Sequence, residues 1–316
     1  MPEGWAALMP PLAILAAAVL LALLVDAAWG EPPTWLHPVV GMGKYLACWQ
    51  DGLLSLRPAS AFVMGTLLWL LGAAGVGALA WAVQEVLLRE LPFIAAAVLL
   101  ALLLKPLLAW RMLRREVQAV EAALAQSLAA GRERLGWLVS RDVSALNETE
   151  VRESAIETLA ENLNDSMVAP VFWFALLGLP GAAIYRFANT ADAMWGYRGR
   201  WEWAGKWAAR ADDVLSWLPA RITALLLALA SVAVSWRGLR NEARRTPSPN
   251  SGWPMAAMAL ALGVRLRKPG VYVLHASGRA AQPADTARAI VLARRVVWLA
   301  AAGVALMALG MQEVRA

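Results

Sequence analysis

Four acidic residues recur at every fourth position in one stretch of the chain: Glu153, Glu157, Glu161 and Asp165. Asn147 and Glu150 precede them with the spacing of a capping box, which predicts a helix that carries the four acids on one face. Like charges at this spacing repel, so we expect a counter-charge. Because carboxylates bind Mg²⁺ and the row leads into the apolar segment 168–184, the row indicates a Mg²⁺ or substrate site. A solvated acidic helix face is the alternative.

A second polar cluster lies between two apolar runs and comprises Arg186, Asn189, Thr190, Asp192, Tyr197 and Arg198. On a helix, Asn189 and Asp192 share a face with Arg186. Polar residues this dense between apolar runs usually line a cavity in a membrane protein, so we interpret the cluster as a binding site. A connecting loop is the alternative.

A third cluster places Asp212 and Asp213 beside Arg210 and Arg221, at the beginning of the apolar segment 217–236. A pair of aspartates next to arginines can bind a metal ion. It can equally form structural ion pairs at a helix N-terminus, where acidic residues are favoured. The sequence supports both interpretations equally.

A proline-rich loop, 247–254, precedes a short helical pattern. Pro254 suits the first turn of a helix, so Ser248, Asn250 and free backbone N–H groups would gather at a helix N-terminus, where anions bind. Basic residues follow the loop, namely Arg265, Arg267 and Lys268. We therefore predict phosphate recognition, with a rigid connector as the alternative.

Histidine and cysteine are scarce, since the chain has only His37, His275 and Cys48. This excludes an intrachain disulfide and a multi-thiolate metal site, so any metal chemistry should use carboxylates. His37 lies in a Pro/Gly-rich turn close to Asp26, where a packed or capping histidine is more common than a catalytic one.

The composition indicates a membrane protein. Hydrophobic residues make up 60% of the 316 residues and charged residues only 16%, the mean hydropathy is +0.53, and 17 of the aromatic residues are Trp. A simple soluble enzyme is thereby excluded. The net charge of +6 fits basic cytoplasmic loops better than nucleic-acid binding, so no nucleic-acid partner is expected. Signatures of P-loop, Rossmann and α/β-hydrolase enzymes are missing from the sequence.

Six apolar runs are candidate membrane helices: 9–29, 61–83, 93–110, 168–184, 217–236 and 290–311. The run 93–110 is interrupted by Lys105 and Pro106, and the run 168–184, broken by glycines and Pro180, is expected to be re-entrant or packed among other helices. We predict an all-α, polytopic integral membrane helical bundle that forms one domain over 1–316. Four to six of its helices would cross the membrane completely.

Two segments between the runs carry most of the Lys and Arg residues, and the positive-inside rule places them in the cytoplasm as a helical segment, 111–167, and a basic segment, 237–288. Residues 111–165 have a net charge of −3 and residues 237–295 a net charge of +9, so the two can hold a metal-phosphate group between them. Ordinary topology-setting charge is the alternative. Apolar residues at helical spacing predict an amphipathic helix over 113–128 that Gly131 ends.

Together these strings resemble the cobinamide-phosphate synthase family (CobD/CbiB) of cobalamin biosynthesis. The matching motifs follow one another along nearly the whole chain: residues 30–33 with 37–39, Arg141-Asp142, 153–165 with Ala169-Pro170, 189–198, Asp212-Asp213 with 219–221, and 247–254. Small departures exist, such as Glu31 where the family has Asp.

The resemblance implies a multi-pass enzyme of the cell inner membrane with a cytoplasmic active site. Such an enzyme joins aminopropanol, or its O-phosphate, to the free carboxyl group of adenosylcobyric acid. It would be an ATP-dependent acid–amine ligase that uses Mg²⁺, with the corrinoid, the amine and the lipid bilayer as its partners. Other membrane-associated cobalamin enzymes are further partners to expect. A catalytically idle membrane sensor or assembly protein and a corrinoid transporter are the alternatives.

Candidate roles follow from the resemblance together with the clusters. We expect Mg²⁺ to be held by acidic residues, which are Glu157, Glu161, Asp165 and Asp192 with Asp212 and Asp213, supported by Asn189. We expect phosphate or substrate to be bound by Arg198, Arg221, Ser248, Asn250 and His37. An acid such as Glu153 or Asp142 would take the proton of the amine.

Overall fold

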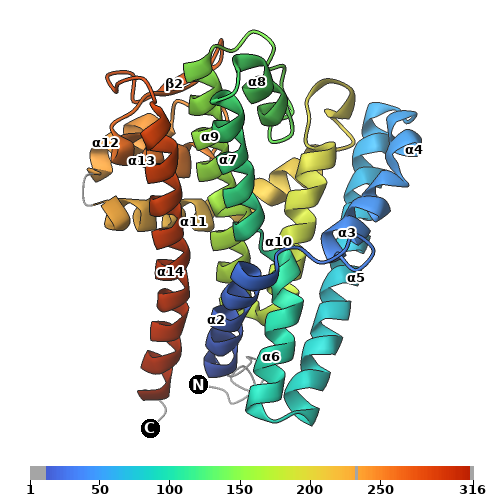
Figure 1. Ribbon diagram of the computed structural model, residues 1–316. Coiled ribbons are helices and arrows are strands. Elements are labelled where there is room, and N and C mark those ends of the chain that lie inside the picture. Colours follow the sequence, from blue (N-terminus) through green and yellow to red (C-terminus); the bar gives the residue numbers. More distant parts are fainter. Residues whose placement is uncertain (1–11, 232–233, 314–316) are drawn as a thin grey trace. The chain divides into compact units, whose positions relative to one another are not determined.

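The computed structural model describes residues 12–231 and 234–313, and most of this part of the chain is helical (Figure 1). Six helical segments are long and apolar enough to cross a membrane: Leu12–Trp29, Pro58–Glu90, Phe93–Leu124, Glu148–Trp195, Lys206–Ser231 and Pro283–Met311. Each of them contains or overlaps one of the six apolar runs of the sequence. The predicted all-α, polytopic bundle is confirmed.

The chain folds into two compact units. Unit 1 is drawn from Met1–Ala109, Ala169–Ser216 and Ala301–Ala316, and unit 2 from Trp110–Val168 and Trp217–Ala300. Both segments that we predict to be cytoplasmic, 111–167 and 237–288, fall within unit 2. The acidic row and the basic segment therefore belong to the same unit.

Prolines mark the ends of helices in unit 1. α5 (Pro58–Glu90) begins with Pro58, in the first turn, where no intrahelical bond needs its missing N–H. It ends at Glu90. The next residue, Leu91, is extended, as expected for the residue before a proline. α6 (Phe93–Leu104) ends in a 3₁₀ turn around the predicted interruption, Lys105–Leu107. The other early helices are α2 (Leu12–Trp29), which packs on α6, α3 (Pro38–Ala47) and α4 (Gln50–Leu54).

α10 (Ala169–Trp195) packs on α5 and is broken in its middle. Gly178 has φ 70° and ψ −156°, a conformation essentially restricted to glycine, and Pro180 lies two residues further on. The N–H of Leu179 donates to the buried Oε1 of Gln84 on α5, at 2.7 Å. Backbone polar groups in an apolar environment need a partner from the protein, so Gln84 is the residue that permits the break.

In unit 2, α7 (Trp110–Leu124) lies beside α9 (Glu148–Leu163) (Figure 1). The predicted amphipathic helix is α7, which buries Leu113, Val117, Val120 and Leu124. Its predicted end is wrong, because Ser127 caps a separate helix, α8 (Leu128–Gly136), by accepting the N–H of Ala130. Gly131 therefore lies inside α8 rather than ending α7.

α9 begins as predicted. The Asn147 side chain accepts the N–H of Glu150 at 3.0 Å, and the Glu150 side chain accepts the N–H of Asn147 at 2.8 Å. A π-helical turn, Asn164–Val168, follows α9. The remaining elements are α11 (Lys206–Ser231), α12 (Trp236–Ala243), α13 (Gly252–Leu262), β1 (Leu266–Lys268), β2 (Tyr272–Leu274) and α14 (Pro283–Glu313). β1 and β2 pair antiparallel around a Pro-Gly turn, a small addition to the predicted helices.

Candidate active site

The acidic row of α9 lies in the interior of unit 2. Every residue from 151 to 160 is buried, and the side chain of Glu153 has no exposed surface. Glu157 is also buried, and Glu161 and Asp165 are half-buried. The first half of the row is therefore not a solvated helix face, and its carboxylates need cations or hydrogen-bond donors from the protein.

The expected counter-charge comes from the basic segment. Arg265 and Arg267 flank the start of β1 and direct their Nε atoms at Glu153, at 3.6 Å and 3.4 Å. Nη2 of Arg267 also lies 2.9 Å from Glu150. The strand places its arginines against the helix because β1 packs directly on α9.

Glu157 is held by partners at both carboxylate oxygens. Nη2 of Arg141 lies 3.0 Å from one oxygen and also donates to Ser154 Oγ at 2.7 Å. The hydroxyl of Tyr272, on β2, donates to the other oxygen. Burial and the adjacent Glu157 charge raise the pKa of Tyr272 above its usual value, so its hydroxyl remains a donor at neutral pH.

The site has unused hydrogen-bonding capacity. The buried Nε–H of Arg141 has no acceptor among the described residues. The Nε atoms of Arg265 and Arg267 face the two Glu153 oxygens as ion pairs, at 3.6 and 3.4 Å, but none of these four atoms makes a hydrogen bond within the described residues. A buried donor without a partner is costly. Phosphate oxygens are suitable acceptors for guanidinium groups. The arrangement is suited to binding a phosphate group next to a carboxylate that can accept a proton.

Glu161 and Asp165 form the second half of the row. Asp165 lies in the π-helical turn, where the Asn164 amide donates to its Oδ1 at 2.8 Å, and Thr223 of α11 in turn donates to Asn164 at 3.1 Å. Glu161 interacts electrostatically with Asp165 and with the cations Lys268 and Arg141. Within the described ranges no three His, Cys, Asp or Glu side chains form a metal-binding group. Glu161 and Asp165 are carboxylates of the kind that could hold Mg²⁺, which takes one or two carboxylates and completes its shell with phosphate and water.

The proline-rich loop is joined to α11 by Arg221. Its guanidinium group stacks on Trp217 and Trp253, at 4.1 and 4.8 Å from the ring centroids, and donates to Asn250 Oδ1 at 3.2 Å. The structure thus brings two predicted phosphate ligands together. Ser248 Oγ accepts the N–H groups of Asn250 and Ser251, both at 3.2 Å, so these amides hold the turn.

Unit 1 holds the other predicted polar residues. Arg186 donates to Asn189 at 3.2 Å and Asn189 to Asp212 at 3.5 Å, which joins the second and third clusters of the sequence. Arg210 lies 3.7 Å from Asp213. Asp192 is half-buried, and Arg198 is exposed.

Two further predicted residues have local partners. Asp142 is exposed and its Oδ1 accepts the N–H of Ser144 at 2.8 Å, a hydrogen bond that lowers the pKa of the carboxyl group and makes it a weaker base. His37, in unit 1, precedes α3 and lies 3.4 Å from Glu31. Of the two acids proposed to take the amine proton, Glu153 is thus the better placed.

Sequence reasoning missed Tyr272 and Thr223. Tyr272 follows a Pro269-Gly270 turn between short runs of strand-forming residues, and this pattern predicts a hairpin. Thr223 has no comparable signal, because it is one polar residue in an apolar helix.

Comparisons with known proteins identify the family. The family model described as "CobD/Cbib protein" matches residues 19–297. "Probable cobalamin biosynthesis protein CobD" of Methanothermobacter thermautotrophicus is 41% identical over 81% of this chain and 85% of its own length. "Cobalamin biosynthesis protein CobD" of Chromobacterium violaceum is 41% identical over 89% of this chain and 93% of its own length. No solved structure has significant similarity to the chain. The chain therefore belongs to the CobD/CbiB family of cobalamin biosynthesis proteins.

Proposed function

We propose that the protein forms the amide bond between the free carboxyl group of adenosylcobyric acid and the amino group of aminopropanol or aminopropanol O-phosphate. The product is adenosylcobinamide or its phosphate. Membership of the CobD/CbiB family supports a step of cobalamin biosynthesis. The structural observation that carries the proposal is a buried carboxylate, Glu153, which Arg265 and Arg267 face as ion pairs at 3.6 and 3.4 Å without a hydrogen bond.

The reaction requires activation, because an ionised carboxylate is a poor acyl donor. In the proposed ATP-dependent ligase, a carboxylate oxygen of the corrinoid attacks the γ-phosphorus of ATP, and ADP leaves. The amine nitrogen then attacks the acyl carbon, inorganic phosphate leaves, and the nitrogen loses a proton. Cations that stabilise phosphoryl oxygens lower both barriers.

The residues of unit 2 divide these tasks. Arg141, whose Nε–H has no acceptor in the described chain, and the ion-paired Arg265 and Arg267 bind phosphoryl oxygens. Glu153 accepts the amine proton, since its oxygens have no hydrogen-bond donor in the described chain. Glu161 and Asp165, assisted by Glu157, would hold Mg²⁺, which supplies charge neutralisation at the phosphates. Roles in substrate or metal binding for Asn189, Asp192, Arg198, Asp212, Asp213 and His37, in unit 1, remain predictions.

The proposed location follows from the positions of the charges. The active site lies in unit 2, which contains both segments predicted to be cytoplasmic, so we place it on the cytoplasmic side of the inner membrane. There the corrinoid, the amine and ATP are all available, and other membrane-associated cobalamin enzymes can receive the product.

The decisive experiment uses the full-length protein purified in detergent. It is incubated with adenosylcobyric acid, aminopropanol phosphate, ATP and Mg²⁺, and mass spectrometry detects the amide product and ADP. We expect both products in equal amounts, and excess EDTA should abolish them. Absence of the amide from folded protein would refute the ligase and favour a sensor. Corrinoid uptake into vesicles without a new amide would favour a transporter.

A further inference from the structure

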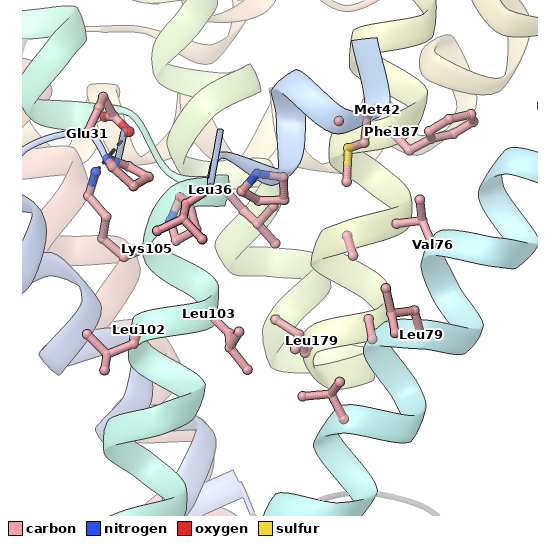
Figure 2. Close-up of a pocket in the computed structure, with 18 of the residues that line it drawn as sticks. Glu31, Leu36, Met42, Val76, Leu79, Leu102, Leu103, Lys105, Leu179 and Phe187 are labelled. Carbon is pink, nitrogen blue, oxygen red and sulfur yellow. Dashed lines mark hydrogen bonds and ion pairs between the residues drawn. The ribbon is translucent and has the colours of Figure 1, made fainter. Parts of the chain in front are cut away.

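An apolar cavity of about 1000 Å³ lies within unit 1, among α2, α3, α5, α6 and α10 (Figure 2). Its wall is built mainly of aliphatic side chains, among them Leu71, Val76, Leu79, Leu103 and Leu179. The volume is at the upper end of the range of small-molecule pockets. No residue of the acidic row lines it, so the proposed reaction assigns the cavity no role.

The cavity is accessible from the faces of two apolar helices. Leu71 and Leu79 of α5 line it and yet are 64% and 69% exposed, and Leu102 of α6 lines it and is 46% exposed. Both helices belong to segments long and apolar enough to cross a membrane. Lipid acyl chains surround such helices. An acyl chain is thus the apolar molecule most available to this cavity, where it would gain the dispersion contacts that an empty space lacks.

One end of the cavity is charged. Figure 2 shows Glu31 and Lys105 close together, apart from Leu79 and Leu179. Lys105 Nζ lies 2.9 Å from Glu31 Oε2 and 3.5 Å from Asp26, and His37 lies 3.4 Å from Glu31. Of these residues, Glu31 and Lys105 line the cavity, and they form an ion pair with each other. The buried Oε1 of Glu31 has no hydrogen-bond partner in the described part of the chain. This end can accept hydrogen bonds from a further cation.

We propose that the cavity is a binding site for an aminophospholipid such as phosphatidylethanolamine. An acyl chain fills the apolar part, and the headgroup ammonium donates to Glu31 Oε1. The unpartnered carboxylate oxygen of Glu31 selects a headgroup that donates a hydrogen bond over choline, which has no donor, and the aliphatic wall selects a lipid over a free amino alcohol phosphate. The site shares no residue with the acidic row, which belongs to unit 2 whereas the cavity belongs to unit 1.

The test fills the cavity with a side chain. Gly75 lines the cavity, and a Cβ added there meets no atom within 4 Å, so Gly75→Phe should occupy lipid space without a clash at Cβ. Gly303 on α14 is equally unobstructed and does not line the cavity, so Gly303→Phe is the matched control. Native mass spectrometry of the full-length proteins should show bound phosphatidylethanolamine in the wild type and in Gly303→Phe, and about tenfold less in Gly75→Phe. Equal amounts in the two variants would refute the proposal.

A second measurement tests the headgroup. Wild-type protein in nanodiscs with equal phosphatidylethanolamine and phosphatidylcholine should retain the former preferentially, whereas Glu31→Gln should still retain a lipid but lose the preference. A wild type without preference would overturn the role of Glu31. Excess free phosphoethanolamine should leave the bound lipid in place. Its displacement would show that the site takes a soluble amino alcohol phosphate instead.

Discussion

Among the acids of the row, Glu153 has the structural environment that best supports a role in the reaction. Its carboxylate is fully buried, two guanidinium groups lie within 3.6 Å, and both its oxygens lack hydrogen-bond donors in the described chain. Glu153→Gln keeps the shape but cannot accept a proton, so we expect amide formation to fall by about 10²–10⁴-fold. Initial rates measured by mass spectrometry check this. The exposed Glu133→Gln on α8 is the control, and equal rates in the two variants would remove Glu153 from the reaction.

Asp165 offers a test of the metal site. Asp165→Asn preserves an oxygen that can accept the Asn164 amide, and it removes the charge that Mg²⁺ requires. We expect no detectable product from the folded variant, even at Mg²⁺ concentrations that saturate the wild type. The rate is measured over a Mg²⁺ titration, with the exposed Asp51→Asn as control. Turnover close to that of the wild type would show that Asp165 holds no essential metal.

Tyr272 gives the site a predictable response to alkali. Its pKa is raised in the folded protein above the usual value of 10.0, so its contribution to stability is complete below about pH 10 and is lost as the pH rises further. Tyr272→Phe should lower the melting temperature in detergent at about pH 8, because Glu157 loses a donor. The difference between the two proteins should shrink by about pH 11. A constant difference would contradict the assigned ionisation.

The sequence predicts those features of the site that involve residues only a few positions apart in the chain. The capping box and the four-step row involve residues three or four positions apart. α9 contains the capping box and the first three acids, and Asp165 lies in the π-helical turn that follows it. The partners of the row are remote: Tyr272 lies 115 positions from Glu157, and Thr223 lies 59 from Asn164. The charge of the basic segment predicts that cations face the acids. Which arginine meets which acid depends on how β1 packs on α9, and no local pattern encodes that.

At the element scale, the interrupted α10 provides a test of stability. Gly178→Ala puts a Cβ on a backbone with φ 70°, and that Cβ would also meet the Gln84 side chain. We expect a loss of about 1–3 kcal/mol in the free energy of unfolding. Gly303→Ala, with open space around its Cβ, should be neutral or slightly stabilising. Unfolding in detergent mixed micelles measures both, and equal stabilities would contradict the assigned strain.

The start of α9 was predicted correctly because a capping box fixes it, whereas the run predicted over 61–83 is extended by the structure to Pro58–Glu90. The end of α7 was predicted incorrectly. Gly131 is a common helix terminator, but Ser127 starts a new helix four residues earlier and accepts the N–H of Ala130. Side-chain capping therefore outweighs the glycine signal here. The only sequence signal of the hairpin is its Pro269-Gly270 turn, because strands of three residues are too short to show alternation.

At the scale of the whole molecule, the positive-inside rule predicts which regions face the cytoplasm. In a Cys48→Ser background, cysteines introduced at the exposed positions Ser144 and Ala276 should react with an impermeant maleimide only after the cells are permeabilised. A cysteine at Glu90, the exposed last residue of α5, should react in intact cells. Opposite labelling of Ser144 and Ala276 would contradict a common cytoplasmic side for the two segments of unit 2.

Composition and apolar runs predict the membrane bundle because hydrophobicity is a property of the chain itself. They do not predict that the bundle divides into two units. Unit 2 joins 110–168 with 217–300 across an intervening stretch of unit 1, and this pairing depends on remote packing. The sequence hints at it through the opposite charges of the two segments, −3 and +9.

The side-chain acceptor at the break in α10 also constrains the order of biosynthesis. Gln84 is translated 94 residues before Gly178, so the acceptor is already within the bilayer when the interrupted helix leaves the ribosome. The backbone N–H of Leu179 lies at the break in the helix, and it can then bond to the Gln84 side chain as soon as the helix inserts. In a circular permutant in which α10 is synthesised before α5, that N–H would have no hydrogen-bond acceptor in the bilayer until α5 inserts. Such a chain should insert poorly and be degraded by membrane proteases.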